Sequence, residues 1–109
     1  MPRKLPHYLH IERRRAGLSQ TDIAALFGVR TASKISRYEH GRRLPPLKTA
    51  LAYEAILGRP IAELFGGTFA AVQGEVKRRA RTLENSSTRP PRGSRFSRRK
   101  ASIQAITAR

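Results

Sequence analysis

The segment from Gly17 to Pro45 constrains the fold of this chain most strongly. It contains two short runs with helical spacing of apolar residues, separated by Gly28 and followed by a basic loop that ends in proline. Ser19 lies three residues before Asp22, the spacing at which a serine hydroxyl caps the start of a helix. Gly28 suits the end of that helix, because glycine adopts left-handed backbone without steric cost. The segment therefore predicts two short helices joined by a tight turn.

Apolar residues at spacings of three and four extend this pattern along the chain. The predicted helices cover about residues 6–16, 20–27, 31–40, 47–57 and 60–65. Gly17 and Gly58 mark two helix ends, and Pro60 suits the first turn of the last helix. The expected inward side chains are Leu9, Ile23, Leu26, Phe27, Ile35, Tyr38, Leu47, Ala50, Leu51, Leu57, Ile61, Leu64 and Phe65. We therefore predict an all-α protein with five helices in its N-terminal part.

The net charge of the chain indicates a polyanionic partner. The sequence has 23 Lys and Arg residues against 7 Asp and Glu residues, a formal net charge of +16. Nucleic acid is the first candidate, and an anionic membrane surface is the second. The chain has no cysteine, which excludes disulfides and a zinc finger. No apolar run approaches the roughly 20 residues of a membrane span, and the first residues lack the apolar segment of a secretory signal. We therefore expect a cytoplasmic, nucleoid-associated protein.

Composition divides the chain into three parts, of which residues 1–66 form the predicted domain. Residues 67–84 predict an amphipathic helix, which either packs on its own domain or forms a dimer interface. Its apolar stripe consists of Phe69, Val72, Val76, Ala80 and Leu83, too narrow a face for a membrane-surface helix. Residues 85–109 hold seven basic residues and no acidic one, with too few apolar residues for a core, which predicts disorder. This basic tail either strengthens binding to a phosphate backbone or only increases solubility.

Six short motifs occur in order within the first part: Leu18-Ser19-Gln20, Ile23-Ala24, Phe27-Gly28-Val29, Ile35-Ser36-Arg37-Tyr38-Glu39, Gly41-Arg42-Arg43 and Pro45. Further matches follow at Leu47, Thr49, Leu51, Leu57-Gly58 and Glu63-Leu64-Phe65. Over about residues 8–65 the chain thus resembles the phage-repressor, or XRE-type, helix-turn-helix family. The resemblance implies a five-helix bundle that binds double-stranded DNA, usually as a homodimer on an inverted repeat.

The resemblance also implies that the third helix lies in the major groove of DNA. The base-contact candidates are Ala32, Ser33, Ser36 and Arg37. Arg37 is the strongest of them, because a guanidinium can bond O6 and N7 of guanine together. A phosphate contact or a solvated arginine is the alternative. Between Val29 and Ile35 the chain has one residue more than the common family pattern, so the positions of Ala32 and Ser33 relative to the bases stay open.

Contacts to the DNA backbone are implied for the start of the second helix and for the loop after the third. Gln20 occupies the position at which the family binds a phosphate with the side chain and the helix-end amides, although it could merely extend the Ser19 cap. The phosphate-contact candidates are Gln20, Thr21, Lys34, His40, Arg42 and Arg43. His7 and His10 are expected to face phosphates or solvent.

Arg13 lies on an inward helical face by its spacing from Leu9 and Ala16, where an unpaired charge costs free energy. Glu39 also lies on an inward face. The resemblance implies a buried or half-buried ion pair between these two residues, which would connect the first helix to the end of the third. Glu54 is a further carboxylate on an apolar face, and it requires a basic partner or lies at an edge or a dimer contact.

The sequence offers little support for catalysis. Its three histidines lack the spacing of metal ligands, and neither a glycine-rich phosphate loop nor a nucleophile beside a base is found. We therefore predict no enzyme activity, no metal and no cofactor, and we predict a sequence-specific DNA-binding transcriptional regulator, a repressor. The alternatives are an interaction protein such as an antitoxin, whose partner would bind residues 67–109, and an RNA-binding protein that uses the basic tail.

Overall fold

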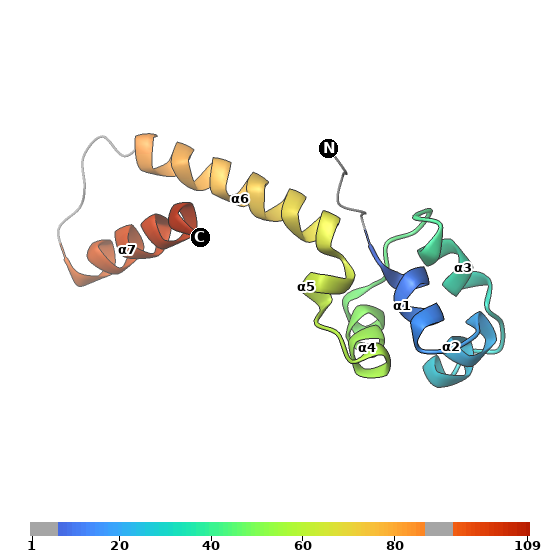
Figure 1. Ribbon diagram of the computed structural model, residues 1–109. Helices are drawn as coiled ribbons and strands as arrows, with labels where there is room; N and C mark the ends of the chain where they lie inside the picture. The colour runs from blue at the N-terminus through green and yellow to red at the C-terminus, as the bar shows by residue number, and fades with distance from the viewer. Residues whose placement is uncertain (1–6, 87–92) are drawn as a thin grey trace. The chain divides into compact units, whose positions relative to one another are not determined.

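The computed structural model describes residues 7–86 and 93–109, and these residues form helices and loops without a β-strand. The helices are α1 (Leu9–Arg15), α2 (Gln20–Phe27), α3 (Ser33–Glu39), α4 (Leu47–Leu57), α5 (Ile61–Leu64), α6 (Gly66–Ser86) and α7 (Ser94–Ala108) (Figure 1). The chain divides into two compact units, Met1–Phe69 and Ala70–Arg109. None of the helices described is long and apolar enough to cross a membrane.

The predicted ends of α2 and α4 are confirmed. The Ser19 hydroxyl accepts a hydrogen bond from the backbone amide of Asp22 at 3.0 Å, and the Asp22 carboxylate accepts one from the backbone amide of Ser19 at 2.9 Å. Gly28 and Gly58 follow α2 and α4 with φ of 76° and 68°, the left-handed backbone that glycine adopts without steric cost. These local signals account for two helices whose bounds the sequence predicted closely.

The core of the N-terminal unit forms where α1 to α5 meet. Its buried residues are Leu9, Ile23, Ala24, Ile35, Tyr38, Ala50, Tyr53, Leu64 and Phe65. Tyr53, which was not among the expected inward residues, is fully buried, and its ring packs edge-on against the rings of Phe27 at 4.9 Å and Tyr38 at 6.4 Å between centroids. Such aromatic pairs add stability beyond the burial of their area. The Tyr53 hydroxyl finds no hydrogen-bond partner within the part of the chain that the structure describes.

The prediction of an inward side chain is wrong at three positions. Leu26, Leu47 and Leu51 are 59%, 71% and 48% exposed. In α4 the buried side chains are Ala50 and Tyr53, so the inward face is rotated away from the leucines. Several apolar faces fit a short helix at spacings of three and four, and the neighbouring helices decide which one is covered.

Glu54 is exposed and caps α5. Its carboxylate accepts a hydrogen bond of 2.8 Å from the backbone amide of Ile61, the first residue of that helix. The helix start leaves this amide without an intrahelical acceptor, and a carboxylate is favoured there. The partner is therefore a backbone group rather than the basic side chain that we considered.

The C-terminal unit contains most of α6 and all of α7. The predicted amphipathic extension is helical, since α6 spans Gly66–Ser86, but a disordered tail is not confirmed over Ser94–Ala108, which form α7. The prolines and the glycine of the tail, at positions 90, 91 and 93, all precede α7. The residues after them are compatible with a helix, but the composition averaged over the whole tail does not indicate it. Residues 87–92 of the tail lie outside the described residues.

Candidate nucleic-acid interface

Helix α3 begins at Ser33, one or two residues later than expected, after a turn that runs from Gly28 to Ala32. Ala32 is the N-cap residue of α3 and packs in part against the core. Ser33 and Arg37 are exposed and lie four residues apart, hence on one face of the helix. Ser36 is half-buried. Of the four base-contact candidates, Ser33 and Arg37 are thus the two that are exposed.

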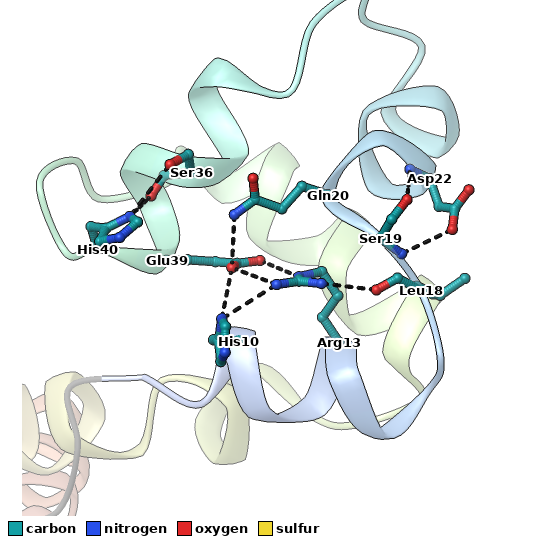
Figure 2. A network of polar contacts seen from close by, with 9 residues as sticks. All are labelled: His10, Arg13, Leu18, Ser19, Gln20, Asp22, Ser36, Glu39 and His40. Atoms are coloured by element: carbon teal, nitrogen blue, oxygen red, sulfur yellow. Dashed lines mark hydrogen bonds and ion pairs between the residues drawn. The ribbon is translucent and has the colours of Figure 1, made fainter.

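The structure brings Arg13 and Glu39 together (Figure 2). Arg13 Nε donates to Glu39 Oε2 at 2.6 Å and Nη2 donates to Oε1 at 3.1 Å, which is a two-pronged ion pair. The side chains of Arg13 and Glu39 are only 11% and 2% exposed. Arg13 Nη1 also donates to the carbonyl oxygen of Leu18 at 2.9 Å. This pair connects α1, the segment before α2 and the end of α3.

Two further side chains converge on Glu39 (Figure 2). Gln20 Nε2 donates to Oε1 at 3.1 Å, and His10 Nδ1 lies 3.2 Å from the same oxygen. Burial disfavours the ionised carboxylate, but the hydrogen bonds from Arg13, Gln20 and His10 outweigh it, and the pKa of Glu39 lies below its ordinary value. Gln20 is therefore held at the start of α2 by its hydrogen bond to Glu39.

Besides His40, four phosphate-contact candidates are exposed: Thr21, Lys34, Arg42 and Arg43. None of the three cations among them forms an ion pair with a residue in the described ranges 7–86 and 93–109. His40, also exposed, follows α3, and its Nδ1 lies 2.7 Å from the carbonyl oxygen of Ser36.

His7 differs from its prediction. Its ring packs edge-on against Phe65 with 6.2 Å between centroids, and its Nδ1 is buried without a partner among the residues described. Burial lowers the pKa of His7 and outweighs the nearby charge of Glu39 and a hydrogen bond with the backbone of Tyr38. The imidazole of His7 is therefore packed and neutral, whereas we expected it to face phosphate or solvent. The reason is that the chain before α1 lies against α5, where the Tyr8 amide donates a hydrogen bond of 2.7 Å to the Leu64 carbonyl oxygen.

The carboxylates of the N-terminal unit are all engaged away from the exposed face of α3. Besides Asp22, Glu39 and Glu54, Glu12 pairs with Arg15 and Arg59, and Glu63 lies 3.8 Å from Arg59. The cations on α3 and in the loop after it therefore keep an uncompensated positive charge, which attracts a polyanion. These cations can be identified from the local sequence. The contact between His10 and Glu39 cannot, because the two residues are 29 positions apart in the chain.

No group of three or more metal-ligating side chains is arranged to hold a metal ion within residues 7–86 and 93–109.

A comparison with protein families finds a match. A family model described as a helix-turn-helix domain matches residues 5–64, which is more than half of the 109 residues and includes α1 to α5. Neither the comparison with curated proteins nor that with solved structures found a match. The capped α2, the turn and the exposed α3 thus lie inside the matched range. The chain belongs to the helix-turn-helix domain family.

Proposed function

We propose that this protein is a sequence-specific DNA-binding transcriptional regulator of the phage-repressor type, which inserts α3 into the major groove. The observation that carries the proposal is the exposed, unpaired positive charge on α3 and on the loop after it, within a helix-turn-helix domain. Such charge supplies the sequence-independent part of DNA affinity. We place the protein at the nucleoid, in the cytoplasm.

Arg37 is the proposed base-contacting residue. It is exposed in the last turn of α3, and a guanidinium bonds both acceptors of guanine in the major groove. Ser33 shares its face and can donate to a base or a phosphate. Ala32 and Ser36 are the remaining base candidates, with smaller exposed surfaces than Arg37.

Backbone phosphates are the proposed partners of Gln20, Thr21, Lys34, His40, Arg42 and Arg43. These six residues lie along the chain from the start of α2 to the loop before α4. Contacts of this kind orient a protein on the duplex without distinguishing base pairs.

A homodimer on an inverted repeat is the proposed binding form. Four residues of the predicted apolar stripe of α6 are about half exposed, namely Phe69, Val72, Val76 and Leu83. An exposed stripe of this spacing supports pairing with a second copy. A small protein bound to DNA excludes other proteins from the site that it covers, and this supports repression.

The proposal is tested by selecting bound duplexes from a random pool with the full-length protein. We expect an enriched inverted repeat, for which Arg37→Ala loses about 1 to 3 kcal/mol of discrimination at one base pair in each half-site. Arg42→Ala should weaken binding to all duplexes alike. Arg14→Ala is the matched control, since Arg14 is an exposed arginine of α1 without an ion pair to any residue that the structure describes. Equal binding of all duplexes at physiological salt would contradict the proposal.

An RNA partner is the second candidate. Four cations of α7 are exposed, Arg95, Arg98, Arg99 and Lys100, and arginine-rich helices suit structured RNA. Competition between the selected duplex and a structured RNA of equal length separates the two functions.

Residues 67–109 also remain the proposed site for a protein partner of the antitoxin kind, and deleting them without effect on a co-expressed toxin would exclude that role.

A further inference from the structure

All three histidines of the chain line one pocket of the N-terminal unit. The pocket has a volume of about 350 Å³ and lies between the start of α1 and the end of α3. His7, His10 and His40 share its wall with Tyr8, Ile11, Glu39 and Gly41. His40 and the start of the Arg42–Arg43 loop belong to the path that we propose for DNA phosphates.

The contacts of His40 determine which ring nitrogen carries the proton. Nδ1 lies 2.7 Å from the carbonyl oxygen of Ser36 and 3.4 Å from its hydroxyl. A carbonyl oxygen only accepts hydrogen bonds, so Nδ1 must be the donor. In the neutral ring Nε2 then has no proton and can only accept.

The same argument applies to His10. Its Nδ1 lies 3.2 Å from Glu39 Oε1 and 3.3 Å from Arg13 Nη2. A carboxylate oxygen only accepts hydrogen bonds, so the shorter of these two contacts favours the proton on Nδ1, and a bond from an imidazole N–H to a carboxylate is charge-assisted. His10 Nε2 therefore also lacks a proton in the neutral ring.

Phosphate oxygens are acceptors, and a neutral ring with its proton on Nδ1 offers them no donor. Protonation changes this, because an imidazolium donates from both nitrogens. We propose that the pocket binds a backbone phosphate of DNA through the protonated rings of His10 and His40, so that DNA affinity rises as the pH falls. This inference rests on the proposed DNA-binding function and adds a proton-linked phosphate contact to it.

The charges that face the two rings are compatible with a bound anion. From α3, Glu39 is compensated by Arg13 of α1 and by the hydrogen bond from Gln20 of α2. Tyr8 is uncharged, and the pKa of His7 is lowered by its burial. Arg42 and Arg43 follow His40 as fixed cations. A phosphate in the pocket therefore meets no unpaired carboxylate.

The experiment measures the Kd of the full-length protein for its selected duplex at pH 8 and pH 6, at constant ionic strength, by fluorescence anisotropy. Uptake of one proton on binding raises the affinity by at most tenfold for each unit by which the pH is lowered, and we expect an overall gain of about tenfold or more. His10→Asn and His40→Asn each keep a donor near the place of Nδ1 and lose Nε2, the nitrogen proposed to take up the proton. The double variant should lose most of the pH dependence, with a gain of less than about threefold between pH 8 and pH 6.

Two controls make the result specific. Arg42→Gln removes a fixed cation and should weaken binding equally at both pH values, and Arg14→Gln should leave both values unchanged. Circular dichroism at both pH values verifies folding of every variant. If the double variant does not fold, the nitrogen resonances of His10 and His40 in the natural protein should report Nδ1–H rings when free and imidazolium rings with the duplex at pH 7.

Equal affinity of the natural protein at pH 6 and pH 8 would overturn the inference while leaving DNA binding in place. So would an unchanged pH dependence in the double variant, or neutral rings in the complex. Failure to bind any duplex at either pH would instead contradict the proposed function.

Discussion

Glu39 and Arg13 make the most polar contacts of the side chains drawn around the end of α3, four each (Figure 2). The Glu39 carboxylate is almost fully buried, and Arg13, Gln20 and His10 reach it from α1 and α2. A buried carboxylate of this kind is stable only while its donors are present. The position of α3 therefore depends on a few polar atoms as well as on apolar packing.

Removing one member of the Arg13–Glu39 pair should cost more than removing both. Arg13→Met leaves a buried carboxylate without its main partner, and we expect the free energy of unfolding to fall by about 3 kcal/mol. The double variant Arg13→Met with Glu39→Leu should lose less than the single variant. Urea denaturation of the natural protein, both single variants and the double variant measures the coupling. Additive losses would show that the pair contributes no coupling energy.

The buried imidazole of His7 predicts a pH dependence of stability. Its pKa in the folded protein lies below the ordinary value of 6.5, so the unfolded chain binds the proton more readily. The free energy of unfolding should therefore be largest above about pH 7 and fall as the pH drops through 6.5. His7→Phe keeps a ring against Phe65 and should flatten this fall. Urea midpoints between pH 8 and pH 5.5 measure it, and an equal fall in the variant would contradict the assignment.

Glu39 affects the free energy of unfolding in a separate and more acidic pH range. Its pKa in the folded protein lies below the ordinary value of 4.5, so its contribution to stability is present above that value and is lost as the pH falls below it. A fall between pH 7 and pH 5.5 can thus be distinguished from the titration of this carboxylate.

Among the helices, α2 has the most complete local signals at its ends. Ser19 and Asp22 satisfy two backbone amides at its start, and Gly28 closes its last turn. Ser19→Ala should lower the free energy of unfolding by about 1 kcal/mol, since one amide loses its acceptor. Ser19→Asp supplies another acceptor and is the matched control. Thermal unfolding compares the variants, and equal melting temperatures for the alanine and aspartate variants would contradict the role of the cap.

The ends of α2 and α4 could be predicted from sequence because caps and glycines act within a few residues of the backbone that they terminate. The covered face of each helix could not. Tyr53 rather than Leu47 or Leu51 fills the core, because Phe27 and Tyr38 present ring faces and edges to that side of α4. Glu54 likewise found a partner seven residues away, at the start of α5, which no periodicity indicates.

For the whole molecule, the net charge of +16 predicts a steep dependence of DNA affinity on salt. The three fixed cations Lys34, Arg42 and Arg43 should contribute about 3 per protomer to the slope of log Kd against log salt concentration. Replacing Arg95, Arg98 and Arg99 of α7 by glutamine should reduce the slope by about 1 for each phosphate contact that is lost. The preferred DNA sequence should not change. Titrations between 50 and 300 mM salt, roughly the range in which such slopes are measured, test this. An unchanged slope would exclude α7 from DNA binding.

The helical class, the capped helices, the charge and the cations around α3 follow from the sequence, because each depends on residue type or on neighbours a few positions away. The two-pronged Arg13–Glu39 contact, the gathering of three histidines around one pocket, and the packing of His7 against Phe65 depend on segments 26 to 58 residues apart meeting in space. The helix α7 was hidden by the composition of the tail as a whole. Contacts between distant segments form only when the chain is closed into one core, so they had to come from the tertiary structure.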